Sequence, residues 1–161
     1  MKNWPWFILS LAVICLDQAS KYWALNYLLP YQSESVFPMV NLTLAYNSGA
    51  AFSFLSGAGE WHRWAFAGFS AIMSVMLIFL ITRLAPSLRL QLLAFGLILG
   101  GAVGNLIDRA LFGYVIDFID VYYKNHHWPV FNVADSAICL GAFLLLIDLA
   151  KTSFLCKDSG C

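Results

Sequence analysis

Two aspartates, Asp117 and Asp135, combine the residue type and the setting that acid–base chemistry requires. Asp117 lies within Val115-Ile116-Asp117-Phe118-Ile119, where apolar residues flank the acid on both sides. A buried carboxylate needs a partner, and Asp135 is the obvious candidate. Two carboxylates within hydrogen-bonding distance share a proton near neutral pH, so that one acts as a base and the other as an acid. This is the arrangement of aspartic proteases, but the spacing of two Asp residues does not by itself identify the reaction.

Asp135 also has a purely structural interpretation. In Asn132-Val133-Ala134-Asp135, Asn132 is suited to the N-cap of a helix, and an acid three residues later can bond back to the cap. The positive end of the helix dipole favours an acid there as well. Capping does not exclude catalysis, because a carboxylate fixed at a helix start is also well positioned for it.

Other polar residues interrupt apolar runs and need partners for the same reason. Asp17 and Lys21 stand four residues apart with the acid first, the favourable order for a pair on one helix face. This pair either neutralises itself and holds the helix in place or contributes to a site. Asn105 and Arg109 lie one turn apart beside Asp108. An Arg–Asp clamp between helices and contact with a substrate carbonyl or lipid head group are the two alternatives for Arg109.

Small residues recur every fourth position at Gly96, Gly100 and Gly104, with Gly101 beside them. Such a face lets membrane helices approach closely, so we interpret it as packing.

Other reaction types find little support. His126 and His127 lie near Asp120, but no HExxH or ligand-spaced cluster predicts a metal site, and we expect all three to be solvated loop residues. Ser48 and Ser53 lack the setting of a serine nucleophile. No metal and no cofactor are expected.

The composition predicts which elements must position these residues. Of 161 residues, 61% are hydrophobic and 11% charged, which is outside the range of soluble proteins. Nine basic and nine acidic residues balance, so nothing indicates nucleic acid as a partner. Apolar runs long enough to cross a bilayer predict an all-α membrane protein with one domain over 1–161 and helices at about 6–29, 64–81, 90–110 and 133–150.

Two longer segments connect these helices, at about 30–63 and 112–132. Alternation in Asn41-Leu42-Thr43-Leu44-Ala45-Tyr46, with a turn signal at 47–49 before 50–55, predicts a small β-sheet between the first two helices. The second segment is aromatic and is expected to be an interfacial loop. Lys2, Arg83, Arg89, Lys151 and Lys157 collect on one side, so both termini are expected in the cytoplasm and the two aspartates on the outer side.

Several segments together resemble the lipoprotein signal peptidase (signal peptidase II) family of bacterial inner membranes. The resemblance follows the family's order over nearly the whole chain. It rests on Leu16-Asp17-Gln18-Ala19-Ser20-Lys21, Ala45-Tyr46-Asn47-Ser48-Gly49-Ala50-Ala51-Phe52-Ser53, residues 100–109 (Gly100-Gly101-Ala102-Val103-Gly104-Asn105-Leu106-Ile107-Asp108-Arg109), Val115-Ile116-Asp117-Phe118 and Phe131-Asn132-Val133-Ala134-Asp135-Ser136.

This resemblance implies a membrane aspartyl endopeptidase that removes the signal peptide from diacylglyceryl-modified prolipoproteins, cutting before the lipidated cysteine. It implies Asp117 and Asp135 as the catalytic dyad, membrane lipids as surroundings and globomycin-type peptides as inhibitors. The family's β-cradle corresponds to the segment around 41–55. Supporting or substrate-contacting roles fall to Asp17, Lys21, Asn47, Gly101, Asn105, Arg109, Asn132 and Ala134.

Two functions from other classes remain open on the residues alone. A small proton-coupled transporter or channel subunit would use Asp17, Asp117 and Asp135 as a relay, but paired broken helices are not evident. A non-enzymatic assembly protein would use the same acids only for capping and pairing.

Overall fold

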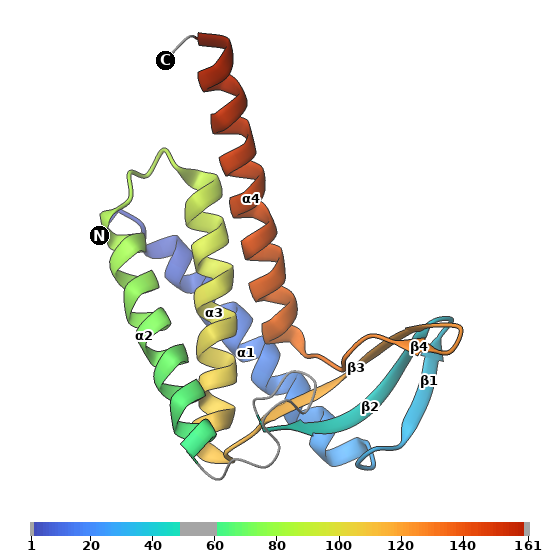
Figure 1. The fold of residues 1–161 in the computed structure, drawn as a ribbon. Helices are drawn as coiled ribbons and strands as arrows, with labels where there is room; N and C mark the ends of the chain where they lie inside the picture. Colours follow the sequence, from blue (N-terminus) through green and yellow to red (C-terminus); the bar gives the residue numbers. More distant parts are fainter. Residues whose placement is uncertain (1, 49–60, 160–161) are drawn as a thin grey trace.

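The computed structural model describes residues 2–48 and 61–159, and four long helices dominate it (Figure 1). Each is long and apolar enough to cross a membrane. Their ends differ by a few residues from those expected, and the last helix continues well beyond residue 150. They are α1 (Trp4–Tyr27), α2 (Trp61–Arg83), α3 (Arg89–Leu111) and α4 (Val133–Ser159).

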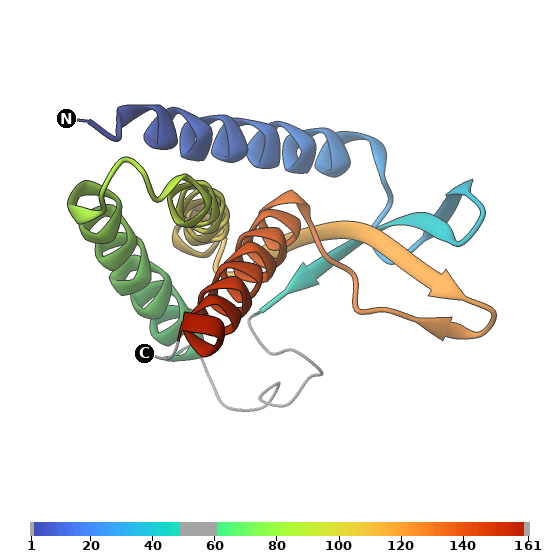
Figure 2. The same ribbon diagram turned by 90° about the horizontal axis from the view of Figure 1, so that it is seen from above.

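Helix α3 lies at the centre of the bundle and packs against α1, α2 and α4 (Figure 2). The glycines of α3 make this possible, which confirms their interpretation as packing residues. A Cβ at Gly100 would lie 2.6 Å from Val13 Cβ and 2.8 Å from the Ser10 carbonyl oxygen on α1. Gly101 faces the opposite neighbour, α4, at Ala134 and Ile138. The two adjacent glycines thus let two helices reach the α3 backbone from different sides.

Substitution of Gly101 by alanine is expected to separate α3 from α4. The added Cβ would collide with the Ala134 carbonyl oxygen and approach Ile138 Cγ1 to 2.7 Å. Overpacking of this kind costs about 1–3 kcal/mol, and backbone is the less yielding neighbour. Thermal unfolding in detergent should therefore occur at lower temperature. Gly68→Ala is the matched control, because a Cβ at Gly68 meets nothing within 4 Å; equal stability of the two variants would contradict the argument.

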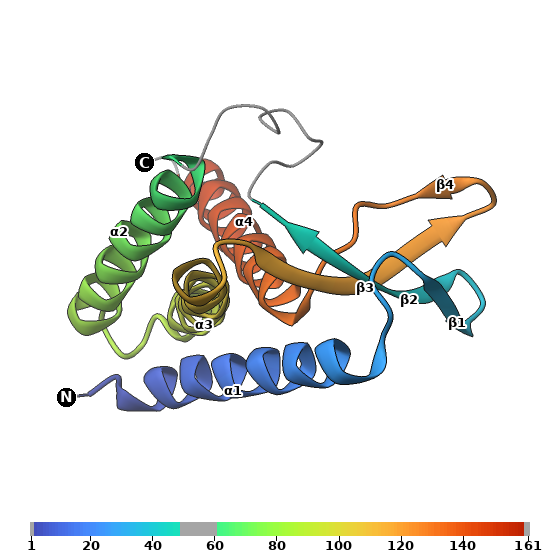
Figure 3. The ribbon, with the colours of Figure 1, turned by 90° about the horizontal axis from the view of Figure 1, so that it is seen from below.

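A sheet of four antiparallel strands projects sideways from the end of the bundle where α1 and α3 end and α4 begins (Figure 3). The strand order is β1-β2-β3-β4. The strands are β1 (Ser33–Phe37), β2 (Val40–Asn47), β3 (Val115–Tyr123) and β4 (His126–His127).

The predicted placement of the sheet was incomplete. Both connecting segments contribute to it, since β1 and β2 precede α2 while β3 and β4 precede α4. The hairpin turn lies between Phe37 and Val40, and the 47–49 turn signal instead marks the end of β2; the expected second strand at 50–55 lies outside the described residues. Strand β3 was interpreted as a loop because Val115 to Phe118 are buried on both faces and therefore show no polar–apolar alternation.

A hydrophobic cluster joins the sheet to the bundle. Ala24 and Leu28, at the end of α1, pack with Leu44 of β2 and with Ile116 and Phe118 of β3. All five side chains are at most 5% exposed. Because Ile116 and Phe118 flank Asp117 in sequence, this cluster fixes the backbone that carries the acid.

The expectation of a solvated Asp120 was wrong. Asp120 lies on β3 and is only 3% exposed. Its carboxylate lies 2.8 Å from Nδ1 of His127 on β4, and Asn41 of β2 donates to it at 3.3 Å. His126 and His127 are exposed, as expected, although they lie in a strand. Asp120 therefore helps to hold β2, β3 and β4 together.

Candidate active site

Asp117 is buried where β3 leaves the bundle. Its side chain is 1% exposed, and both carboxylate oxygens accept hydrogen bonds from asparagine amides. Asn132 Nδ2 donates to Oδ1 at 2.6 Å, and Asn47 Nδ2, at the end of β2, donates to Oδ2 at 3.0 Å. Two separate segments therefore fix the orientation of this acid.

Asp135 lies in the first turn of α4, and the predicted capping interaction is confirmed. The Asp135 amide donates to Asn132 Oδ1 at 2.9 Å, and the Asn132 amide donates to Asp135 Oδ2 at 3.3 Å. Asn105 Nδ2, on α3, donates to the other oxygen, Oδ1, at 2.8 Å. The cap thus orients Asp135, and Asn105 holds it against α3.

The two asparagines that hold the aspartates also contact each other. Asn132 Nδ2 lies 3.2 Å from Asn105 Oδ1, while Asn105 directs its own amide nitrogen to Asp135. Asp117 and Asp135 are therefore connected through two side-chain amides. This link brings together residues from β3, α3 and the start of α4.

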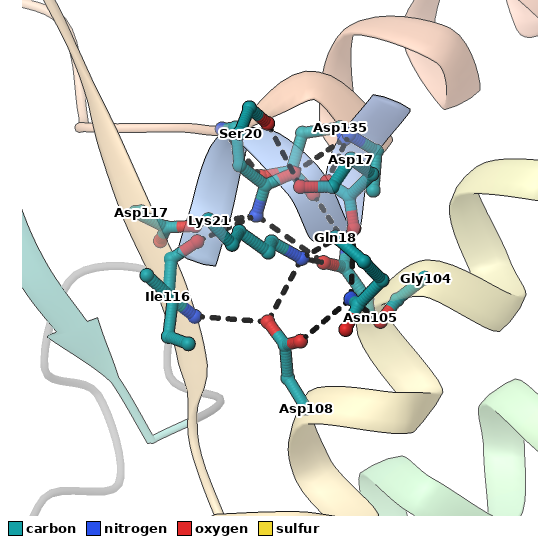
Figure 4. Close-up of polar contacts among 12 residues, drawn as sticks. Asp17, Gln18, Ser20, Lys21, Gly104, Asn105, Asp108, Ile116, Asp117 and Asp135 are labelled. Carbon is teal, nitrogen blue, oxygen red and sulfur yellow. Dashed lines mark hydrogen bonds and ion pairs between the residues drawn. The ribbon is translucent and has the colours of Figure 1, made fainter. Parts of the chain in front are cut away.

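A buried ion cluster supports this link (Figure 4). Lys21 Nζ lies 2.8 Å from Asp17 Oδ2 and 2.8 Å from Asp108 Oδ2, and it donates to Asn105 Oδ1 at 3.0 Å. The predicted Asp17–Lys21 pair is confirmed, but it includes a second acid from α3. Because the ammonium requires an acceptor, it fixes the Asn105 amide with its oxygen toward Lys21 and its nitrogen toward Asp135.

The same cluster joins α1 to the start of α4. Asp17 Oδ1 accepts a hydrogen bond from the Ala134 amide at 2.9 Å. Gly104 provides the space, because a Cβ there would lie 2.6 Å from Asp17 Oδ2. A carboxylate in this position also satisfies an unpaired amide at the positive end of the α4 dipole.

The predicted ion pair between Arg109 and an Asp of another helix is not formed among the residues that the structure describes. Asp108 instead binds Lys21, accepts the Ile116 amide at 3.1 Å and lies 2.9 Å from Gln18 Nε2. Arg109 extends over the Phe66 ring, and its Nε is buried without a hydrogen-bond partner in the described part of the chain. Arg109 therefore retains a donor for a further group.

Burial and charge both act on Asp117. Desolvation is the larger cause and the charge of Asp135 the second, and together they raise the pKa of Asp117 to about 7. Hydrogen bonds from Asn47 and Asn132 act in the opposite direction, because they favour the ionised form. Asp117 can consequently hold or release a proton near neutral pH.

Of the ten residues that the sequence singled out, the structure brings nine into one connected arrangement. Gly101 and Ala134 contribute backbone contacts between α3 and α4, while Arg109 lies within electrostatic range of Asp135, Asp108 and Asp117. Within the described part of the chain, no three His, Cys, Asp or Glu side chains are placed to hold a metal ion. The nine connected by hydrogen bonds or ion pairs are Asp17, Lys21, Asn47, Asn105, Arg109, Asp117, Asn132, Ala134 and Asp135.

Arg63 is a supporting residue that the sequence did not reveal. It lies in the first turn of α2 and donates to the Arg109 carbonyl at 3.1 Å and to the Ala110 carbonyl at 2.8 Å. It thereby satisfies carbonyls at the negative end of α3. Gly113, with φ of 87°, begins the turn toward β3 beneath this guanidinium. In the sequence, the only visible feature of Arg63 was its position beside an apolar run.

Arg63→Ala is expected to loosen the end of α3 and the turn that leads to Asp117. A helix-end cation contributes about 0.3–1 kcal/mol, so the protein should still fold. Small displacements of catalytic groups reduce rates strongly, and we expect turnover to fall about tenfold. Kinetics of the purified variant measure this, with partial rescue by Arg63→Lys. Arg83→Ala, at the other end of α2, is the control, and an equal loss there would contradict a role at the site.

Comparison with known proteins identifies relatives that match most of the chain. A family model described as "Signal peptidase (SPase) II" matches residues 9–151. A lipoprotein signal peptidase from Acinetobacter baumannii is 50% identical over 156 residues, covering 97% of this chain and 87% of the relative. One from Teredinibacter turnerae is 51% identical over 143 residues, covering 89% and 85%.

Two solved structures share the fold. One, titled "Bacterial membrane enzyme structure by the in meso method at 2.3 A resolution", has a TM-score of 0.82 and 32% identity, covering 92% of this chain and 89% of the other. A second, with the same title but at 1.9 Å resolution, has a TM-score of 0.79 and 32% identity, covering 90% and 92%. Both agree with a multi-pass membrane protein.

Proposed function

Since the chain belongs to the signal peptidase II family of aspartic endopeptidases, which remove signal peptides from prolipoproteins, we propose that Asp117 and Asp135 are its catalytic pair. The observation that carries this proposal is their connection through Asn105 and Asn132, with each acid held by amide donors. The bond cut is the one before the cysteine that carries a diacylglyceryl group.

In the mechanism that we propose, Asp117 is the acid and Asp135 the base. The raised pKa of Asp117 keeps its proton up to about pH 7. Asp135 takes a proton from a water molecule, whose oxygen attacks the scissile carbonyl carbon while Asp117 protonates the carbonyl oxygen. The tetrahedral intermediate then collapses: one of its hydroxyls returns a proton to Asp117 as the carbonyl re-forms, the C–N bond breaks, and the leaving amine receives the proton taken by Asp135.

The other site residues divide into two groups in this proposal. Asp17, Lys21, Asn105 and Asn132 orient the two acids, since their polar groups are already engaged with one another. Asn47 likewise holds Asp117, through its amide donor, whereas Arg109 remains a candidate for contact with the substrate backbone, which in lipid must have its polar groups satisfied. The unpaired Nε supports this role for Arg109.

The proposed location is the bacterial inner membrane, with both termini in the cytoplasm and the site facing the periplasm. In Figure 1 the N-terminal end of α1 and the C-terminal end of α4 lie at the end of the bundle opposite the sheet. Arg83 and Arg89 flank the turn at the same end. Basic residues collect on the cytoplasmic side of membrane proteins, which supports this orientation.

One experiment separates the proposal from the transporter and assembly alternatives. Purified protein is incubated with a diacylglyceryl-modified precursor, and release of the signal peptide is followed with and without globomycin. We expect cleavage before the modified cysteine and its inhibition by globomycin. Absence of cleavage by the folded protein would refute the proposal.

The activity is expected to decline as the pH rises through about 7. Below this value Asp117 is protonated and can donate, whereas above it Asp117 is ionised and the proton donor is lost. This decline is the alkaline limb of the profile of kcat/KM against pH. Asn47→Ala removes a hydrogen bond that lowers the pKa of Asp117, so the limb should move to higher pH. Asn26→Ala, an exposed asparagine on α1, should leave it in place; a limb insensitive to Asn47 would count against Asp117 as the donor.

A further inference from the structure

We propose that a pocket between the β4–α4 connection and the first turns of α4 binds an acyl chain of the lipid-modified cysteine. The inference rests on the proposed function, because it assigns a place to one part of that substrate. The pocket has a volume of about 360 Å³. It is lined by Trp128, Pro129, Val130, Phe131, Asp135, Ser136 and Cys139.

The pocket begins at the reacting groups. Asp135 is part of its wall, and Ser136 adds a hydroxyl. The remaining lining comes from aromatic, aliphatic and thiol side chains. An occupant must therefore have a polar end at Asp135 and an apolar remainder. The diacylglyceryl cysteine has this polarity, because its ester groups adjoin the peptide and its hydrocarbon chains extend away from it.

The far end of the pocket continues into a lipid-facing surface. Cys139 is exposed, and the exposed side chains of Leu140, Phe143 and Leu146 follow on α4 with exposed fractions of 51%, 58% and 63%. These residues lie within the membrane-spanning part of α4 and recur every three or four residues, so they form one stripe. A chain leaving the pocket at Cys139 would thus enter hydrocarbon without crossing water.

The two apolar parts of the substrate differ in width. A helical signal peptide with its side chains is about 10–12 Å wide. A single hydrocarbon chain is much narrower, so it suits the pocket of about 360 Å³ better. The acyl chain moves from one apolar environment, the membrane, to another, the pocket. Its binding therefore contributes little hydrophobic free energy. The pocket instead directs the modified cysteine toward Asp135.

Cys139 allows a direct test with full-length protein. Cys139→Trp places a large side chain in the wall of the pocket, and Cys15→Trp makes the same change at an exposed cysteine of α1. Precursors carrying long or short acyl chains on the cysteine are compared. We expect Cys139→Trp to slow cleavage of the long-chain precursor about tenfold, because its modified cysteine is no longer directed toward Asp135, and to affect the short-chain precursor much less. Cys15→Trp should cleave both normally.

A second measurement does not depend on how the tryptophan variant folds. The Asp117→Asn variant is mixed with a precursor whose acyl chain carries a photoreactive diazirine, and the cross-linked residues are located by mass spectrometry. Cross-links within residues 128–139 are expected. Equal slowing of both precursors by Cys139→Trp, or cross-links elsewhere, would overturn the proposed subsite while leaving the proposed function intact. If the unmodified enzyme cleaves no lipidated precursor, the proposed function itself fails.

Discussion

Replacement of either Asp117 or Asp135 by asparagine is expected to eliminate cleavage of a diacylglyceryl-modified precursor. Asparagine has nearly the same shape as aspartate but neither takes up nor releases a proton near neutral pH. Loss of a positioned acid or base costs about 10²–10⁴-fold in rate, and in a mechanism that needs both we expect the upper end of this range. The measurement is initial cleavage rate by the purified variants in detergent or lipid.

The structure provides a close control for these variants. Asp120 is also a buried acid on β3, three residues from Asp117, but it binds His127 and Asn41 in the sheet. Asp120→Asn should therefore retain most of the activity. All three variants should insert into the membrane and unfold at temperatures close to that of the unmodified protein. Substantial turnover by Asp117→Asn or Asp135→Asn would refute the catalytic assignment.

Lys21→Met is expected to have the largest effect on stability. Lys21 is 1% exposed and is shared by Asp17 and Asp108, both of which are fully buried. Methionine fills a similar volume but leaves two carboxylates without their counter-ion. Removing one partner of a buried ion pair costs about 3–5 kcal/mol, and here the loss also frees the Asn105 amide that holds Asp135.

Thermal unfolding in detergent measures this effect, with activity assayed on whatever protein remains folded. Lys124→Met is the control, because Lys124 is exposed and lies over the ring of Tyr123. A Lys21 variant of normal stability that has lost turnover would show that Lys21 acts in catalysis, not in assembly. If Lys21→Met and Lys124→Met proved equally stable and active, the buried cluster would have neither role.

Features that depend on neighbours along the chain were predictable. The capping interaction between Asn132 and Asp135 and the ion pair between Asp17 and Lys21 involve residues three or four positions apart, and both are present. The membrane helices were predictable because each is a long, predominantly apolar run. Strand β3 was not, since burial on both faces removes the alternation that identifies a strand.

The contacts that assemble the site join residues far apart in sequence. Lys21 binds Asp108 on α3, the amide of Ala134 on α4 donates to Asp17 on α1, and Arg63 binds the carbonyls that end α3. No local spacing selects these partners from the other polar residues of the chain. They are selected when close approach at Gly100, Gly101 and Gly104 brings the helices together and buries groups that then require one another.

Composition and motifs are properties of the chain, and they suffice to predict a membrane protein of the signal peptidase II family with Asp117 and Asp135 as candidate acids. How the acids are held depends on tertiary packing. It connected them through Asn105 and Asn132, added Asp108 to the Lys21 pair, and combined two distant segments into one sheet. The physical reason is that burial leaves each polar group dependent on a partner, and packing alone decides which partner is within reach.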